Sequence, residues 1–226
     1  QDLGDSWSEA ESRQLLAGAE LGLENIAAAQ QQAEHSLRIC RTFHQAPTAG
    51  PLCRLGRIAR EQGHDHSAAR SYLEALQPTA ESGNLFVMLM PLSGLAEIAS
   101  RHEQAETAAT LVGAIEAIKH RLGSEHIPTA KTNAERAREK ARTLLGDEAF
   151  EQLRQQGLGL STSQAVRLAQ HVIVPPRVPG EAEPHWLAES PGARAVDSLP
   201  SALAQREPRA GHASAEGTPP CQPSGN

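Results

Sequence analysis

A pattern of small and apolar residues recurs in the first half of this chain about every 40 residues. Its fixed points are Ala29, Ala68 and Ala108, which lie 39 and then 40 residues apart. Around each alanine the apolar residues follow helical spacing, and an earlier stripe with the same spacing precedes it. Such a period is typical of helical hairpins that stack, because one pair of helices alone cannot bury its apolar face. The repeat therefore predicts an all-α fold of stacked helical hairpins.

The clearest repeat runs from Leu52 to Leu76. Its two stripes are separated by Gly63, a residue type that commonly ends helices, and by a polar turn over 64–66. Small residues on both stripes allow the two helices to approach closely. The residues that define the repeat by their size or apolarity are Leu52, Leu55, Gly56, Gly63, Ala68, Tyr72 and Ala75 here, and Leu95, Ala96 and Ala108 in the next repeat.

This unit resembles the tetratricopeptide repeat position by position. Leu55-Gly56 matches its Leu-Gly pair, and Ala68 and Tyr72 match its second-helix signature. The period exceeds the roughly 34 residues of the minimal repeat, and the extra residues fall between repeats. The resemblance implies a right-handed solenoid whose concave groove is lined by first helices. The polar residues expected on that lining, as candidate contacts for a protein or peptide partner, are Arg54, Arg57, Arg60, Glu61, Glu97 and Arg101.

Composition divides the chain into three parts. Residues 1–122 hold about three repeats. Residues 123–174 predict one polar helix and two shorter ones, an arrangement that suits the cap of a solenoid. Residues 175–226 contain 10 of the 15 prolines and no helical stripe, which predicts a disordered tail. Within this tail, Trp186-Leu187 and residues 196–203 are the candidates for a transient helix or a short binding motif.

Two elements at the end of the repeats, followed by the segment 161–168, carry a second resemblance; the last helix is predicted from Thr162 to about Val172, with Ser161 as its N-cap. The elements are Ala108-Ala109-Thr110-Leu111-Val112-Gly113-Ala114 and Leu145-Gly146-Asp147-Glu148-Ala149-Phe150. They look like the C-terminal tetratricopeptide region of large bacterial signalling ATPases, such as LuxR-type transcriptional regulators and adenylate cyclases or kinases with a predicted ATPase core. Thr107 and Thr110 stand where that family commonly has Arg. The resemblance implies a cytoplasmic sensor or interaction scaffold that works with an upstream ATPase module, so we expect the chain to be part of a longer protein.

The chain contains no G-x-x-x-x-G-K-[ST] phosphate loop, so no ATPase activity is expected from these residues. Two alternatives to the regulator stay open. One is a freestanding tetratricopeptide adaptor, and the other is the non-catalytic end of a kinase or adenylate cyclase polypeptide.

Neither the composition nor any cluster of residues indicates catalysis, a metal or a cofactor. The net charge of −6 disfavours direct contact with nucleic acid, and no run reaches the roughly 18 apolar residues of a membrane span. His64, His66 and His102 are expected in solvated turns, because zinc needs three or four convergent ligands. Cys40 and Cys53 are expected as small core hydrophobes in a reducing cytoplasm, with a catalytic cysteine as the alternative. We therefore predict a binding protein that is not an enzyme.

Overall fold

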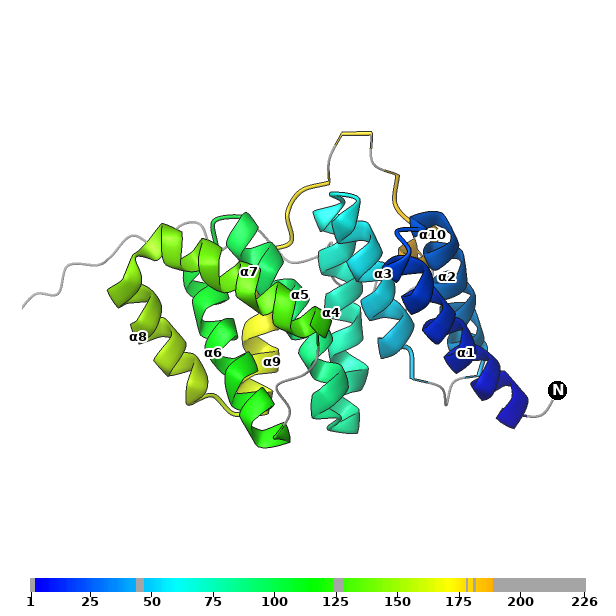
Figure 1. Cartoon of the computed structure of the whole chain (residues 1–226), viewed down its shortest axis with the longest axis horizontal. Helices are drawn as coiled ribbons and strands as arrows, with labels where there is room; N and C mark the ends of the chain where they lie inside the picture. Colours follow the sequence, from blue (N-terminus) through cyan, green and yellow to red (C-terminus); the bar gives the residue numbers. More distant parts are fainter. Residues whose placement is uncertain (1–2, 44–46, 124–127, 178, 181, 189–226) are drawn as a thin grey trace, which may run out of the picture. The chain divides into compact units, whose positions relative to one another are not determined.

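Every regular element in the described part of the chain is an α-helix (Figure 1). The computed structural model describes residues 3–43, 47–123, 128–177, 179–180 and 182–188. Its helices are α1 (Leu3–Gly22), α2 (Ile26–Thr42), α3 (Ala49–Glu61), α4 (Asp65–Ser82), α5 (Leu85–Arg101), α6 (Ala105–Leu122), α7 (Pro128–Leu145), α8 (Asp147–Leu158), α9 (Thr162–Gln170) and α10 (His185–Ala188). The prediction of an all-α fold is confirmed. The candidate segment 196–203 lies outside the described residues.

The first six helices pair as α1 with α2, α3 with α4 and α5 with α6, and each pair packs on the next. Each of the three turns contains one residue with a left-handed backbone, namely Glu24 (φ 60°), Gly63 (φ 82°) and Glu103 (φ 61°). These positions repeat with the same spacing as the alanines. The turn is therefore the structural counterpart of the sequence period.

The hydrogen bonds of the three turns also repeat. The residue after the left-handed position donates its amide to the carbonyl five residues earlier, and its own carbonyl accepts from the alanine four residues later. The bonds are Asn25 to Glu20, His64 to Ala59 and Gln104 to Ala99 at 2.8–2.9 Å, followed by Ala29 to Asn25, Ala68 to His64 and Ala108 to Gln104 at 3.0 Å. All three alanines are fully buried in the first turn of a second helix. A larger side chain there would hold the two helices of the hairpin apart.

Tyr72 marks the contact between the second and third hairpins. Its ring lies against two glycines: a Cβ at Gly56 would come within 2.9 Å of the ring, and one at Gly94 within 2.4 Å. The ring is 1% exposed and belongs to the largest core cluster. Gly56, which matches the Leu-Gly pair in sequence, therefore makes room for the tyrosine of its own repeat, while Gly94 does so from the next.

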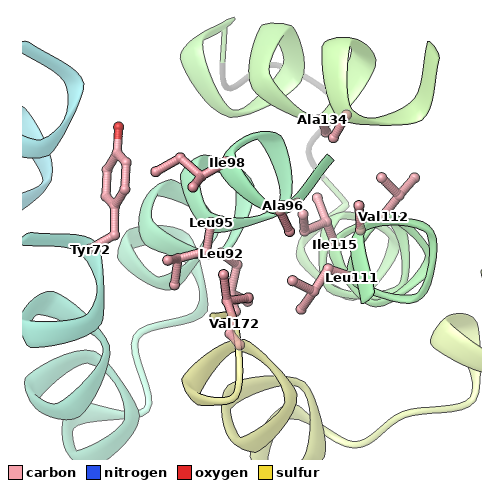
Figure 2. Packing of buried hydrophobic residues seen from close by; sticks show 14 of the residues in the cluster. Tyr72, Leu92, Leu95, Ala96, Ile98, Leu111, Val112, Ile115, Ala134 and Val172 are labelled. Atoms are coloured by element: carbon pink, nitrogen blue, oxygen red, sulfur yellow. The ribbon is translucent and has the colours of Figure 1, made fainter. Parts of the chain in front are cut away.

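Helices α7, α8 and α9 complete the core around the third hairpin. Helix α7 packs on α5 and α6, α8 packs on α6, and α9 contacts α4, α5 and α6. Figure 2 shows Ala134 of α7 and Val172, just past α9, on opposite sides of the α5–α6 pair. The predicted capping helices thus share one hydrophobic core with the repeats.

Helices α6 and α8 cross with their backbones in contact at two glycines. A Cβ on Gly113 would lie 2.0 Å from the Arg154 carbonyl oxygen, and one on Gly157 would lie 2.0 Å from the Thr110 carbonyl oxygen. Gly113 is the glycine of the Ala-Ala-Thr-Leu-Val-Gly-Ala element, so its lack of a side chain is explained by the packing of α8.

The Leu-Gly-Asp-Glu-Ala-Phe element forms the corner between α7 and α8. Gly146 adopts φ 79° just before α8 begins, a backbone that glycine accepts at little cost. Phe150 is fully buried, and the Arg142 guanidinium lies 4.9 Å from the centre of its ring. The corner therefore combines a sharp chain reversal with one large aromatic anchor.

We predict that Gly113→Ala and Gly157→Ala each lower the free energy of unfolding by about 1–3 kcal/mol, because a methyl group would meet a backbone carbonyl that cannot rotate away. Gly159→Ala is the matched control, since a Cβ there meets only the Gln156 carbonyl oxygen at 3.4 Å. We expect the control to stay within about 0.5 kcal/mol of the parent chain. Urea unfolding followed by circular dichroism measures all three, and equal effects at positions 113 and 159 would contradict the backbone contact.

Candidate functional site

The candidate partner contacts on α3 occupy different environments. Arg57 donates from Nε to Glu61 Oε1 at 2.8 Å, and both side chains are partly exposed. The guanidinium of Arg54 instead lies against Gly18 of α1, and its buried Nε has no hydrogen-bond partner among the described residues. Burial lowers the pKa of Arg54, and the neighbouring Arg57 lowers it further. Arg54 is therefore a cation held at the α1–α3 contact.

Arg60 and Glu97 form an ion pair in the interior. Their side chains are 4% and 7% exposed. Arg60 also donates to Asn133 Oδ1 of α7 at 2.5 Å, and Arg136 approaches Glu97 Oε1 at 3.4 Å. The expectation that Arg60 and Glu97 face a partner is corrected here, because α7 packs on α5 and covers both side chains.

Arg101, at the end of α5, forms an ion pair with Asp65, at the start of α4, and so connects the turns of two successive hairpins. Its Nη1 lies 3.0 Å from Asp65 Oδ1, and His102 Nε2 lies 2.8 Å from Asp65 Oδ2. Asp65 is the first residue of α4, where a negative charge is favoured by the helix dipole. His66, the second residue of α4, hydrogen-bonds through Nδ1 to the Pro175 carbonyl at 2.9 Å. Among the residues that the structure describes, no three His, Cys, Asp or Glu side chains gather as a metal site requires.

Sequence reasoning missed an apolar surface on α1. Trp7, Leu15 and Leu16 are 45%, 69% and 45% exposed, whereas Ala10 and Ala17 of the same helix are buried. The sequence could have indicated these exposed residues, because positions 7, 15 and 16 do not fall on the helical stripe of Ala10, Ala17 and Leu21 that is buried. We call these three side chains the α1 surface.

The segment after α9 also behaves differently from the predicted tail. We call residues 171–177, 179–180 and 182–188 the C-terminal strap. The Gln104 side chain pairs with the backbone of Ile173, donating to its carbonyl at 2.9 Å and accepting from its amide at 2.8 Å. At the other end of the strap, Trp186 and Leu187 are 5% and 1% exposed within the core cluster of α1 to α4. A tail without packed structure was predicted from Pro175 onward, but the strap packs on the hairpins; residues 189–226 lie outside the described part.

The two cysteines of the described chain are both buried and free. Burial raises the pKa of the Cys53 thiol to about 12, against a smaller lowering by Arg54. Burial also raises the pKa of Cys40. A thiol that stays protonated at neutral pH is a poor nucleophile, so their environment suits core packing.

Comparisons with known proteins do not assign a family. No protein-family model, curated protein or solved structure matches this chain. None of the helices in the described residues is both long and apolar enough to cross a membrane. The fold is therefore characterised by its own geometry: helical hairpins with one repeated turn, closed by three further helices and a strap.

We predict that Glu97→Gln lowers the free energy of unfolding by about 3–5 kcal/mol, because it leaves the Arg60 guanidinium buried without its carboxylate. Glu61→Gln is the matched control, since its hydrogen-bonded partner Arg57 is partly exposed and its carboxylate approaches Arg60 only to 3.9 Å; we expect a loss of about 0.5 kcal/mol or less. The double variant Arg60→Met/Glu97→Met should regain part of the loss. Urea denaturation measures each variant, and a Glu97→Gln effect no larger than that of Glu61→Gln would contradict an internal ion pair.

We also predict that the chain loses stability at alkaline pH through Cys53 and Tyr72. Burial raises the pKa of both groups, from ordinary values of 9.0 and 10.0. Their contribution to stability is complete well below pH 9, where both groups are neutral in the folded and the unfolded chain. Above that, the unfolded chain ionises first, so stability falls by about 1.4 kcal/mol per pH unit for each group as pH rises towards the folded pKa values.

Urea unfolding between pH 8 and about 11 measures this slope. Tyr72→Phe and Cys53→Ala should each remove the contribution of one group, up to about 1.4 kcal/mol per pH unit, from the slope of stability against pH. An unchanged slope in both variants would show that other groups cause the alkaline loss.

Proposed function

We propose that this chain is a protein-interaction or sensor scaffold rather than an enzyme. In this proposal it is a tetratricopeptide-like array from the C-terminal region of a cytoplasmic bacterial signal-transduction or transcriptional regulator. Support comes from the three equivalent turns, the buried alanine at each, and the tyrosine seated between glycines of successive hairpins. The two elements that resemble bacterial signalling ATPases also gain a physical reason, since Gly113 and Gly146 both serve the packing of α8.

The observation that carries the proposal is the α1 surface. In a stacked array, a helix face that no other helix covers normally presents polar residues to water. Helix α1 contacts α2 and α3, yet it leaves Trp7, Leu15 and Leu16 exposed. Leu15 and Leu16 are adjacent in sequence and lie on the side of α1 away from its buried stripe, and large apolar side chains left in water in this way are candidate contacts for another protein surface. We propose that the α1 surface receives a helical partner, either the ATPase module of the same polypeptide or a separate protein.

The coding sequence upstream of the Gln1 codon tests the regulator. We expect it to encode a nucleotide-binding module with a phosphate loop. Cyclase or kinase catalytic motifs there would favour the non-catalytic end of such an enzyme. An upstream sequence with none of these would overturn the regulator and leave a freestanding adaptor.

The surface itself is tested by binding to the encoded upstream module, measured by isothermal titration calorimetry. We predict that Leu15→Glu/Leu16→Glu weakens association by about tenfold or more, because two carboxylates would lose water on docking. Leu144→Glu is the matched control, since Leu144 is a leucine 46% exposed on α7. The melting temperatures of the free variants should match the parent, because these leucines are already solvated. Equal affinities for the double variant and the control would show that the partner docks elsewhere.

A further inference from the structure

The C-terminal strap follows the second helices of the hairpins in reverse order. Helix α9 contacts α6 and α4, and the strap then passes His66 near the start of α4. It ends in α10, which contacts α4 and is linked to α2 by His185 and Glu34, whose Nε2 and Oε2 atoms lie 3.4 Å apart. The strap is thus in contact with three hairpins that precede it in sequence.

A charged anchor holds one end of the segment 183–187. Arg70 of α4 is 5% exposed, and its Nη1 pairs with Glu183 Oε1 of the strap. Arg177 also approaches Glu183, with 3.4 Å between Nη2 and Oε2. A guanidinium with so little access to water depends on a carboxylate partner, so Arg70 selects an acidic residue at this place.

An apolar anchor holds the other end. The Trp186 indole donates from Nε1 to Ser71 Oγ at 3.4 Å, one residue along α4 from Arg70. Leu187, beside it, is 1% exposed within the core cluster that α1 to α4 form. An indole that is buried and also hydrogen-bonded is the type of side chain that dominates protein-binding interfaces.

The segment that carries these anchors has the properties of a peptide ligand. Its only regular element is one helical turn of four residues, too short to be stable alone. Pro175, Pro176 and Pro179 disfavour a helix in the preceding chain, where residues 179–180 form a turn. Its position is therefore fixed by a carboxylate, an indole and a leucine, which is how short linear motifs are recognised on helical surfaces.

We propose that the surface of α4 and α2 around Arg70, Ser71 and Glu34 is a binding site for a short acidic–aromatic peptide. The ligand has a carboxylate three residues before a Trp–Leu pair, and residues 183–187 of this chain occupy the site as a replaceable internal ligand. A partner protein carrying the same motif displaces the strap. This site is separate from the α1 surface, so either can fail without the other.

Because the strap is tethered to the chain, it competes for the site at its own effective concentration, which a partner peptide must exceed. A short tether gives it an effective concentration on the order of 1 mM, so a free peptide competes poorly with the intact strap. Removing the internal side chains vacates the site and exposes its intrinsic affinity.

The experiment uses the 226-residue chain with Trp186→Ala/Leu187→Ala as the vacated receptor. A fluorescein-labelled peptide, Glu-Ala-Glu-Pro-His-Trp-Leu-Ala, is titrated and followed by fluorescence anisotropy. We expect saturable binding to the vacated receptor, at least about tenfold tighter than to the parent chain. A peptide with Ala in place of Trp should not bind.

Charge recognition is tested in the same receptor. Arg70→Gln should weaken peptide binding about tenfold or more, because the peptide carboxylate then loses its cation. Arg121→Gln is the matched control, an exposed arginine on α6, and should leave binding within about twofold. No saturable binding to a folded vacated receptor, or equal effects of the two arginine variants, would overturn the proposal.

A second variant tests whether the strap is replaceable even where the vacated receptor fails to fold. Glu183→Lys keeps the apolar side chains but places a second cation beside Arg70. In a Trp7→Phe background, which leaves Trp186 as the one tryptophan of the chain, we expect it to release the strap: tryptophan emission shifts to longer wavelength, acrylamide quenching increases, and the labelled peptide binds about tenfold more tightly than to the parent. Glu148→Lys, at an exposed glutamate of α8, is the charge-matched control. Protected tryptophan and unimproved peptide binding in Glu183→Lys would overturn the replaceable ligand.

Discussion

The turn between the two helices of each hairpin is the constraint on which the rest of the structure depends. One residue takes a left-handed backbone, and the next donates its amide to a carbonyl five residues earlier. Gly63 adopts this backbone at little cost, whereas Glu24 and Glu103 adopt it against the preference of L-residues, which costs about 1–2 kcal/mol per residue. The surrounding hydrogen bonds and the buried alanine must supply that energy. Because all three turns have the same geometry, successive hairpins present equivalent faces and can stack.

Close approach of helices then replaces the large aromatic core that this composition lacks. Only 3% of the residues are aromatic, so the interior depends on a few large side chains placed against glycine and alanine. Tyr72 lies between Gly56 and Gly94, and Gly113 and Gly157 let α6 and α8 touch through their backbones. Short interhelical distances increase the number of van der Waals contacts for each small residue. A chain built in this way is therefore sensitive to a single added methyl group at a crossing point.

The sequence predicted what is periodic and missed what depends on non-repeating contacts. The hairpins, the turn at Gly63 and the buried alanines follow from spacing alone, because each repeat imposes the same local requirements. The burial of Arg60 and Glu97 does not, since it arises where α7 lies across α5, and nothing in the repeat pattern places α7 there. Trp186-Leu187 was singled out as a candidate short motif, but its packing on the hairpins was not predicted: proline content predicts an absence of regular helix, yet a largely non-helical strap needs only a few anchored side chains to pack.

The strap and helix α9 cover outer faces of the hairpins that stacking alone leaves exposed. Stacking buries the faces that hairpins turn towards each other, but the outer faces of the second helices and the ends of the stack receive no cover from the repeat itself. Helix α9 and the strap cover α6, α4 and part of α2 with the chain's own residues, whereas the α1 surface keeps its apolar side chains in water. A surface covered through an ion pair and two side chains exchanges its cover more readily than one covered by a full helix, because fewer contacts must break. In the function we propose, these least firmly covered surfaces, the strap site and the α1 surface, are therefore where we expect a partner protein to bind.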